Sequence, residues 1–331
     1  MIKDTAYYID KIFRIPGIQT FNELAIEIFH YQYLNNSIYR TFVDLLNIQP
    51  GKIKSVNSIP FLPVEFFKTN EVITGKDNIQ QVFLSSGTSG AEQSRHCITD
   101  ISVYEKSFRK GFRHFYGAPE QYCFLALLPS YMERQSSSLV YMVEDLIKQS
   151  THKDSGFYLH NTEDLMKKLL ELDKAGQKVM LLGVSYALLD VVEKHQLKLK
   201  NTIVMETGGM KGRRKEMIRE ELHAILCKGF GLDAIHSEYG MTELLSQAYS
   251  KGNGLFQCPP WMKVLIRDTN DPFSFIANNK TGGINIIDLA NINSCCFIAT
   301  QDLGKINQDG FFEVLGRFDN SDLRGCNLMI G

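Results

Sequence analysis

The stretch Ser85-Ser86-Gly87-Thr88-Ser89-Gly90 directly follows the apolar run Val82-Phe83-Leu84, so the sequence predicts a strand that ends in a loop of small residues. Hydroxyl and backbone N–H groups in such a loop can converge on an anion, and its glycines reach backbone angles that other residues resist. A Ser/Gly run by itself is more often a plain surface turn. The loop lacks the lysine of a Walker A motif, so any phosphate binding here must use a different geometry.

From about residue 71, short β-rich runs alternate with helical segments on both sides of this loop. The expected strands are Gln81–Leu84, Cys123–Leu128, Lys178–Leu182, Thr202–Met205, Lys263–Ile266, Ile284–Leu289, Phe297–Thr300 and Phe311–Leu315. Helices are expected over 101–115 and 213–227, where apolar residues recur at helical spacing. This alternation predicts an α/β fold of layered sheets and helices. After about residue 260 the intervening helices stop, which predicts a β-rich, antiparallel C-terminal part.

The first 70 residues follow a different pattern. Apolar side chains recur at helical spacing at Phe21, Leu24, Ile28 and Tyr31, which predicts helices over 1–50. Prolines and a glycine interrupt residues 50–70, so this stretch is expected to run extended. We therefore expect two parts, an N-terminal helical segment (1–70) that packs on the core and one contiguous large core (71–331).

The composition narrows the class of protein. The 331 residues are 44% hydrophobic and 22% charged with a net charge of −1, which is typical of a globular chain and gives no basic excess for nucleic acid. Neither a membrane-length apolar run nor a secretion signal is present, so a cytoplasmic location is expected. The seven cysteines include no CxxC pair, which argues against a zinc site, and most should be small buried side chains.

Three further strings follow the loop along the chain. Glu206-Thr207-Gly208-Gly209-Met210 places two glycines at a strand's end, where a flat ring can lie against the backbone. Tyr239-Gly240-Met241-Thr242-Glu243 offers a hydroxyl for a phosphate oxygen and a carboxylate suited to Mg²⁺. Thr300-Gln301-Asp302-Leu303-Gly304 supplies a carboxylate for ribose hydroxyls, and Gly316-Arg317-Phe318-Asp319 supplies a cation. Each string alone also fits an ordinary turn or helix start, but four in this order are far less expected by chance.

With these four strings, residues 80–325 resemble the adenylate-forming superfamily of acyl and aryl ligases. Within it the chain is most similar to the LuxE-like acyl-protein synthetases, which are related to phenylacetate–CoA ligases. The closer likeness rests on residues 61–68, 127–131, 210–216 and 236–243, and it extends over nearly the whole chain.

The resemblance implies an ATP–Mg²⁺ site. The residues implied to hold the β- and γ-phosphates are Ser85, Ser86, Gly87, Thr88, Ser89 and Gly90. Those implied to line the adenine side are Gly208, Gly209, Met210, Glu238, Tyr239 and Gly240. Those implied at the reacting end are Thr242 on the α-phosphate, Glu243 on Mg²⁺, Asp302 on the ribose, and Arg317 near the ribose or phosphates. Relatives often carry a lysine just after the loop, and Arg95 is expected to replace its charge.

The resemblance also sets expectations for the C-terminal end. Typical superfamily members continue into a lid domain that carries a lysine, whereas this sequence stops at Gly331, so a core without the lid is expected. LuxE-like proteins pass the acyl group from AMP to a cysteine of their own near the C-terminus, and Cys326 stands in that place. Nearby Arg324 and Arg317 would favour its thiolate. The alternative is a structural cysteine near a frayed end.

The resemblance therefore implies an AMP-forming ligase of the long-chain-fatty-acid–protein type. It would activate a fatty acid as acyl-AMP, form a thioester on Cys326 and hand the acyl group to a partner such as an acyl reductase. Two alternatives stay open. One is an acyl- or aryl-CoA ligase, in which the CoA thiol attacks the adenylate directly, and the other is a non-catalytic nucleotide-binding subunit.

Overall fold

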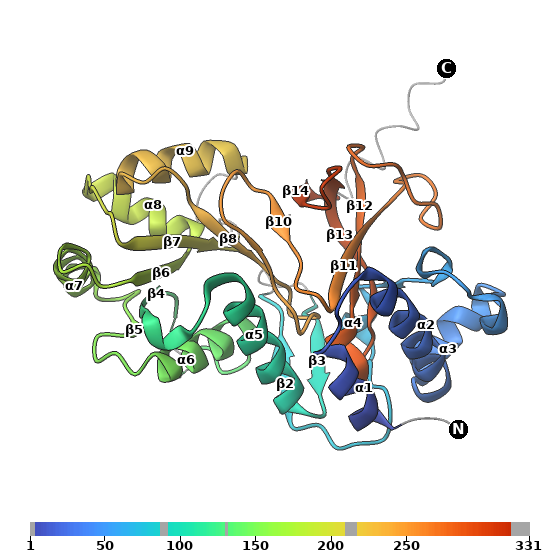
Figure 1. The fold of residues 1–331 in the computed structure, drawn as a ribbon. Coiled ribbons are helices and arrows are strands. Elements are labelled where there is room, and N and C mark those ends of the chain that lie inside the picture. Colours follow the sequence, from blue (N-terminus) through green and yellow to red (C-terminus); the bar gives the residue numbers. More distant parts are fainter. Residues whose placement is uncertain (1–3, 87–91, 130–131, 209–216, 319–331) are drawn as a thin grey trace.

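The computed structural model describes residues 4–86, 92–129, 132–208 and 217–318 (Figure 1). A large mixed sheet runs through both halves of the molecule in the strand order β11-β12-β13-β14-β10-β9-β8-β7-β6-β4-β5, with β1 beside β13. A separate two-stranded sheet pairs β2 (Gln81–Leu84) with β3 (Arg95–Ile98), and Figure 1 shows it between the two halves.

One half of the large sheet is parallel and is covered by helices on both faces. Its strands are β4 (Cys123–Leu127), β5 (Gly156–Phe157), β6 (Val179–Val184), β7 (Thr202–Thr207) and β8 (His236–Tyr239). The helices of this half are α5 (Ile101–Tyr116), α6 (Ser138–Ser150), α7 (Thr162–Lys174), α8 (Ser185–Lys194) and α9 (Arg219–Phe230). Figure 1 shows α8 and α9 on one side of the strands and α5 and α6 on the other. Every residue of β4 and β6 is buried, as continuous apolar runs in a parallel sheet require. The α/β prediction is confirmed.

The other half is antiparallel. Its strands are β9 (Ala248–Ser250), β10 (Phe256–Gln257), β11 (Met262–Arg267), β12 (Gly282–Asp288), β13 (Phe297–Ile306) and β14 (Phe312–Arg317). The antiparallel part begins at β9, earlier than the predicted change near residue 260. Strands β9 and β10 are only three and two residues long, too short to give a periodic pattern.

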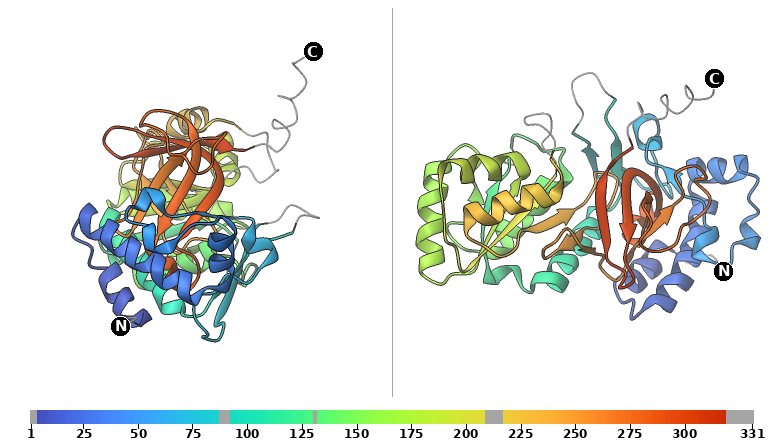
Figure 2. Two further views of the ribbon diagram at one scale, coloured as in Figure 1. Left: turned by 90° about the vertical axis from the view of Figure 1, so that its right-hand side faces the viewer. Right: turned by 90° about the horizontal axis from the view of Figure 1, so that it is seen from above.

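The N-terminal segment forms helices α1 (Thr5–Ile12), α2 (Ile18–Asn35) and α3 (Ser37–Leu45), which lie beside the antiparallel half (Figure 2). Gln32 of α2 is fully buried, and its amide donates to the Asn291 and Ile292 carbonyls at 3.0 Å. Residues 50–70 are extended at β1 (Leu62–Pro63) but are less extended elsewhere than predicted, because they also contain two 3₁₀ turns and the short helix α4 (Phe66–Thr69). The division of the chain at residue 70 stays a prediction.

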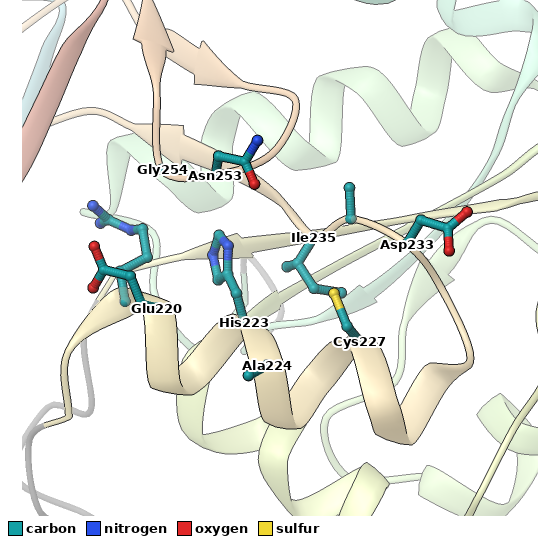
Figure 3. A pocket seen from close by; sticks show the side chains of 10 residues that line it. Glu220, His223, Ala224, Cys227, Asp233, Ile235, Asn253 and Gly254 are labelled. Atoms are coloured by element: carbon teal, nitrogen blue, oxygen red, sulfur yellow. The ribbon is translucent and has the colours of Figure 1, made fainter.

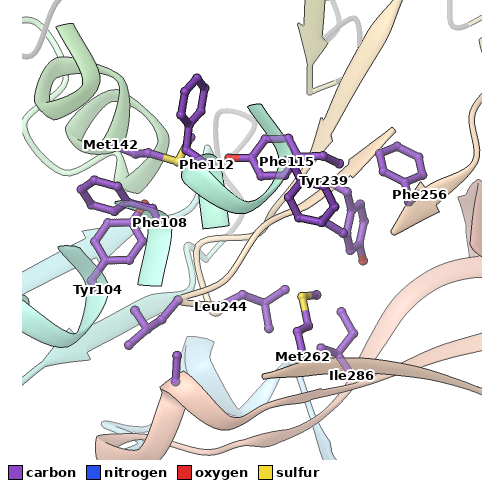
Figure 4. Packing of buried hydrophobic residues seen from close by; sticks show 14 of the residues in the cluster. Tyr104, Phe108, Phe112, Phe115, Met142, Tyr239, Leu244, Phe256, Met262 and Ile286 are labelled. Atoms are coloured by element: carbon purple, nitrogen blue, oxygen red, sulfur yellow. The ribbon is translucent and has the colours of Figure 1, made fainter. Parts of the chain in front are cut away.

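Helix α5 shows how a capping residue and the spacing of apolar residues determine a helix. Asp100 caps it by accepting a hydrogen bond from the Ser102 N–H at 3.0 Å. Its predicted apolar face is buried apart from half-buried Ile101. Figure 4 shows four of its aromatic side chains among residues of several strands and Met142 of α6, namely Tyr104, Phe108, Phe112 and Phe115. Helix α9 starts later than predicted, at Arg219, so Ile218 precedes it and is 66% exposed.

No helix in the described parts of the chain has the length and apolar character needed to span a membrane.

Candidate active site

The phosphate-loop motif begins with Ser85 and Ser86, directly after β2 and before β3 in the sequence. Its base is closed by two hydrogen bonds, one from the Ser85 N–H to the Ser94 carbonyl at 3.0 Å and one from the Ser94 N–H to the Ser85 hydroxyl at 2.9 Å. Ser85 and Ser86 are the described residues of this motif. Seven predicted site residues lie outside the described parts of the chain, namely Gly87, Thr88, Ser89, Gly90, Gly209, Met210 and Cys326.

One face of β3 contacts the Thr242–Glu243 turn. The Nδ1 of His96 lies 2.8 Å from the Thr242 carbonyl, and the Ser94 hydroxyl hydrogen bonds the Glu243 carboxylate. Glu243 is 5% exposed, and burial raises the pKa of its carboxyl, against the opposing effects of Ser94 and the Arg317 charge. The two residues predicted at the α-phosphate and the metal are therefore held against the strand that follows the phosphate loop.

Arg95 lies on the opposite face of β3. Its guanidinium forms an ion pair with Glu71 at 3.2 Å, and both side chains are about half exposed. Because residues alternate between the two faces of a strand, Arg95 cannot share the face that Ser94 and His96 present to Glu243. The structure does not bring Arg95 together with Thr242 and Glu243.

A second cluster of predicted site residues lies where β8, β13 and β14 meet. It consists of Tyr239, Asp302 and Arg317. Asp302 on β13 and Arg317 on β14 are register partners, and Nε of Arg317 lies 3.5 Å from Oδ1 of Asp302. The Tyr239 hydroxyl donates to Oδ2 of Asp302 at 2.7 Å. The Asp302 side chain is 14% exposed, and burial raises the pKa of its carboxyl although Tyr239 and Arg317 favour the charged form. Arg317 is 68% exposed, so its charge can reach a ligand.

The predicted adenine wall lies at the ends of β7 and β8. Gly208 has a φ of +63°, a left-handed conformation that favours glycine, and its carbonyl accepts a hydrogen bond from the Ser185 hydroxyl at 2.7 Å. The Thr207 hydroxyl donates to the buried Glu238 carboxylate at 2.6 Å. A Cβ on Gly240 would clash with an oxygen of the Glu238 carboxylate, so the absence of a side chain at Gly240 leaves room for this carboxylate beside the backbone.

Arg219 is a residue of this region that the sequence pattern did not single out. Its guanidinium pairs with Glu206 at 3.2 Å, donates to the Val314 carbonyl at 3.0 Å and lies 4.9 Å from the centre of the Phe256 ring. Burial works against a charged Glu206, but its contacts with His223 and Arg219 leave its pKa lowered. Arg219 thus ties the end of β7 in the parallel half to β14 in the antiparallel half.

A pocket of about 240 Å³ lies between α9 and the turn that joins β9 to β10 (Figure 3). Its lining residues are Arg219, Glu220, His223, Ala224, Cys227, Asp233, Ala234, Ile235, Asn253 and Gly254. The pocket contains none of the residues predicted to bind the nucleotide. Arg219 links it to Glu206 and so to the strand that carries the adenine wall.

The described residues fit a magnesium ion that is bound mainly through phosphates. They contain no group of three or more His, Cys, Asp or Glu side chains arranged to hold a metal. Mg²⁺ commonly takes one or two protein carboxylates together with water and substrate phosphates. Glu243 is a buried carboxylate, and burial disfavours its charged form unless a cation lies nearby. It is therefore suited to be the one protein carboxylate that such an ion needs.

The fold is similar to that of several solved ligases. ATP-bound MatB from Rhodopseudomonas palustris aligns with a TM-score of 0.56 and 14% identity over 73% of this chain and 49% of MatB. An open conformation of 2-hydroxyisobutyryl-CoA ligase in complex with 2-HIB-AMP and CoA aligns with a TM-score of 0.68 and 12% identity over 91% of this chain and 71% of the ligase. This chain therefore spans about half the length of MatB.

No curated protein matches the chain in sequence. The family model described as acyl-protein synthetase, LuxE, matches residues 18–331, which is nearly the whole chain. The chain belongs to the LuxE acyl-protein synthetase family.

Proposed function

We propose that this protein activates a carboxylic acid with ATP and passes the acyl group to its own Cys326. The observation that carries the proposal is the convergence of Thr242 and Glu243 on the strand after the phosphate loop. Asp302 and Arg317 supply a carboxylate and a cation at the neighbouring edge. The similar MatB structure holds ATP, and that of the 2-hydroxyisobutyryl-CoA ligase holds 2-HIB-AMP, which supports the same chemistry here.

In the first step an oxygen of the substrate carboxylate attacks the α-phosphorus of ATP. The bond from that phosphorus to the oxygen bridging the α- and β-phosphates breaks, which gives acyl-AMP and pyrophosphate. Asp302 would accept the ribose hydroxyls, and Thr242 would bond an α-phosphate oxygen. Mg²⁺ held by Glu243 would offset the negative charge of the phosphates. The protein would then act mainly by positioning and by electrostatic stabilisation.

In the second step the thiolate of Cys326 attacks the acyl carbon, a thioester forms, and AMP leaves with the electron pair of the broken C–O bond. A nucleophilic cysteine needs a readily formed thiolate. Burial raises the pKa of each cysteine in the described parts of the chain, to about 11 for Cys123 and about 12 for Cys258 and Cys295. Those cysteines are poor candidates for the acyl acceptor, which supports Cys326.

The proposed final acceptor is a partner protein such as an acyl reductase, and the proposed acid is a fatty acid. Direct transfer to CoA is the second candidate, because the similar 2-hydroxyisobutyryl-CoA ligase holds CoA together with 2-HIB-AMP. The two candidates differ in whether a covalent acyl-protein appears.

Cys326→Ser is expected to abolish covalent labelling of the protein by radioactive fatty acid and ATP. The label on the unchanged protein should be released by hydroxylamine, since a thioester is labile to it. Cys258→Ser serves as the matched control, because Cys258 is a half-buried residue whose thiol pKa is raised by burial to about 12, and the substitution should leave the label intact.

If Cys326→Ser keeps a hydroxylamine-labile label, the proposed acceptor is wrong. If the unchanged protein forms acyl-CoA and AMP without any acylated protein, the CoA ligase is the better description.

A further inference from the structure

His96 is a fully buried histidine that joins two parts of the candidate site far apart in sequence. It lies on β3, the strand that leads away from the phosphate-loop motif, and its Nδ1 is 2.8 Å from the carbonyl of Thr242, 146 residues further along the chain. A carbonyl can only accept, so the hydrogen must be on Nδ1. Burial lowers the pKa of His96 to about 4, so the ring is neutral near neutral pH.

The other ring nitrogen, Nε2, has no hydrogen-bond partner among the residues that the structure describes. The Nε2 of His96 is buried, and no group in the described parts of the chain donates to it. The ring otherwise packs edge-on against Phe67, with 5.5 Å between the ring centres. A buried, unpaired acceptor is costly, and an apolar side chain would avoid that cost. The contact with Thr242 is the one polar interaction among the described residues that distinguishes histidine here from a similarly sized apolar residue.

The segment that carries Thr242 and Glu243 has no regular secondary structure and is held by side chains from elsewhere. Asn291 donates to the Glu243 carbonyl at 2.8 Å, and the Asp288 carboxylate accepts from the Leu245 and Ser246 N–H groups at 2.9 Å. Asn291 and Asp288 both belong to the antiparallel half, at the end of β12 and the 3₁₀ turn after it. His96 holds the same segment from the β2–β3 sheet.

We propose that His96 is a positioning residue, which holds the Thr242–Glu243 turn against β3, the strand that follows the phosphate-loop motif in the sequence, through its hydrogen bond to the Thr242 carbonyl. The inference rests on the proposed function, because it assigns the loop to the β- and γ-phosphates and the turn to the α-phosphate and Mg²⁺. Two sites that bind neighbouring phosphates of one molecule must keep a fixed separation. A misplacement of about 1 Å can cost on the order of 100-fold in rate.

The test compares two amides at position 96. In His96→Asn the amide N–H can take the place of Nδ1–H and donate to Thr242, whereas the longer side chain of His96→Gln places its amide near Nε2. For acid-dependent ATP–pyrophosphate exchange, His96→Gln is expected to lower kcat about 100-fold with little change in the KM for ATP, as expected for a geometric defect at the reacting centre. His96→Asn should retain activity within about fivefold of the unchanged protein, since it keeps the hydrogen bond.

The inference is overturned if folded His96→Gln exchanges as fast as the unchanged protein, or if folded His96→Asn is as impaired as His96→Gln. Should His96→Gln fail to fold, His96→Met replaces it, because methionine fills a similar space without a donor. If the unchanged protein catalyses no exchange with any acid, the proposed function fails by itself. His96 is then judged by amide hydrogen exchange in residues 240–247, where protection unaltered by the Gln or Met variant refutes its positioning role.

Discussion

Asp302→Ala is expected to weaken ATP binding by about 100-fold or more, because a carboxylate that accepts both ribose hydroxyls makes two charge-assisted hydrogen bonds of about 1.5–3 kcal/mol each. The geometry suits this role. Tyr239 already donates to Oδ2 of Asp302, and Arg317 lies beside Oδ1, so the carboxylate is held in one orientation at the edge of the site. Titration calorimetry with ATP measures the affinity directly, and circular dichroism checks that the variant is folded.

Two further variants make this result specific. Tyr239→Phe removes the hydroxyl that orients Asp302 but leaves the carboxylate and its contacts with the ribose, so a smaller loss of about fivefold is expected. Glu313→Ala removes another acid from the same β13–β14 hairpin, one that pairs with Lys305 at 3.1 Å, and should leave ATP affinity unchanged. Undiminished affinity in a folded Asp302→Ala protein would rule out the assigned ribose contact.

Glu243→Gln is expected to lower the rate of ATP–pyrophosphate exchange by about 100- to 1,000-fold, the range seen when one group that stabilises developing charge is removed. The substitution keeps the shape of the buried side chain but removes the charge that would hold Mg²⁺. The Ser94 hydroxyl can still donate to the amide oxygen, so the turn should keep its place. The measurement is the exchange rate as a function of Mg²⁺ concentration, where the variant should need far more metal.

Glu71→Gln is the matched control for Glu243. Glu71 is an acid near the same hairpin, but it is about half exposed and pairs with Arg95 on the outer face of β3. Its removal should not alter the metal dependence. A Glu243→Gln protein with an unaltered Mg²⁺ requirement would mean that the metal is held elsewhere.

The apolar strands of this fold could be predicted from the sequence because their composition already indicates their burial. Strand β4 is the run Cys123-Phe124-Leu125-Ala126-Leu127, with all five residues buried. Strand β8 could not be predicted from an apolar composition. Its residues His236-Ser237-Glu238-Tyr239 are mostly polar, yet three of the four are buried, because partners such as Thr207 and His223 satisfy their polar atoms.

The candidate site likewise contains residues that the sequence could indicate and residues that it could not. The motifs singled out Thr242, Glu243 and Asp302 as candidates, since short spacings are visible in a linear sequence. They did not reveal Arg219 or His96, whose partners Val314 and Thr242 lie 95 and 146 residues away. The role expected of Arg95 depends on a strand that the sequence did not predict, because only the alternation along β3 turns it away from Glu243.

Formation of an acyl-adenylate by this chain is the central step of the proposed function, and ATP–pyrophosphate exchange detects it without a coupled reaction. The unchanged protein is assayed with Mg²⁺ and ATP against a panel of short, long and aromatic acids. We predict exchange that depends on the acid, is fastest with a long-chain fatty acid and disappears without Mg²⁺. A folded protein that shows no exchange with any acid of the panel would contradict the proposed chemistry.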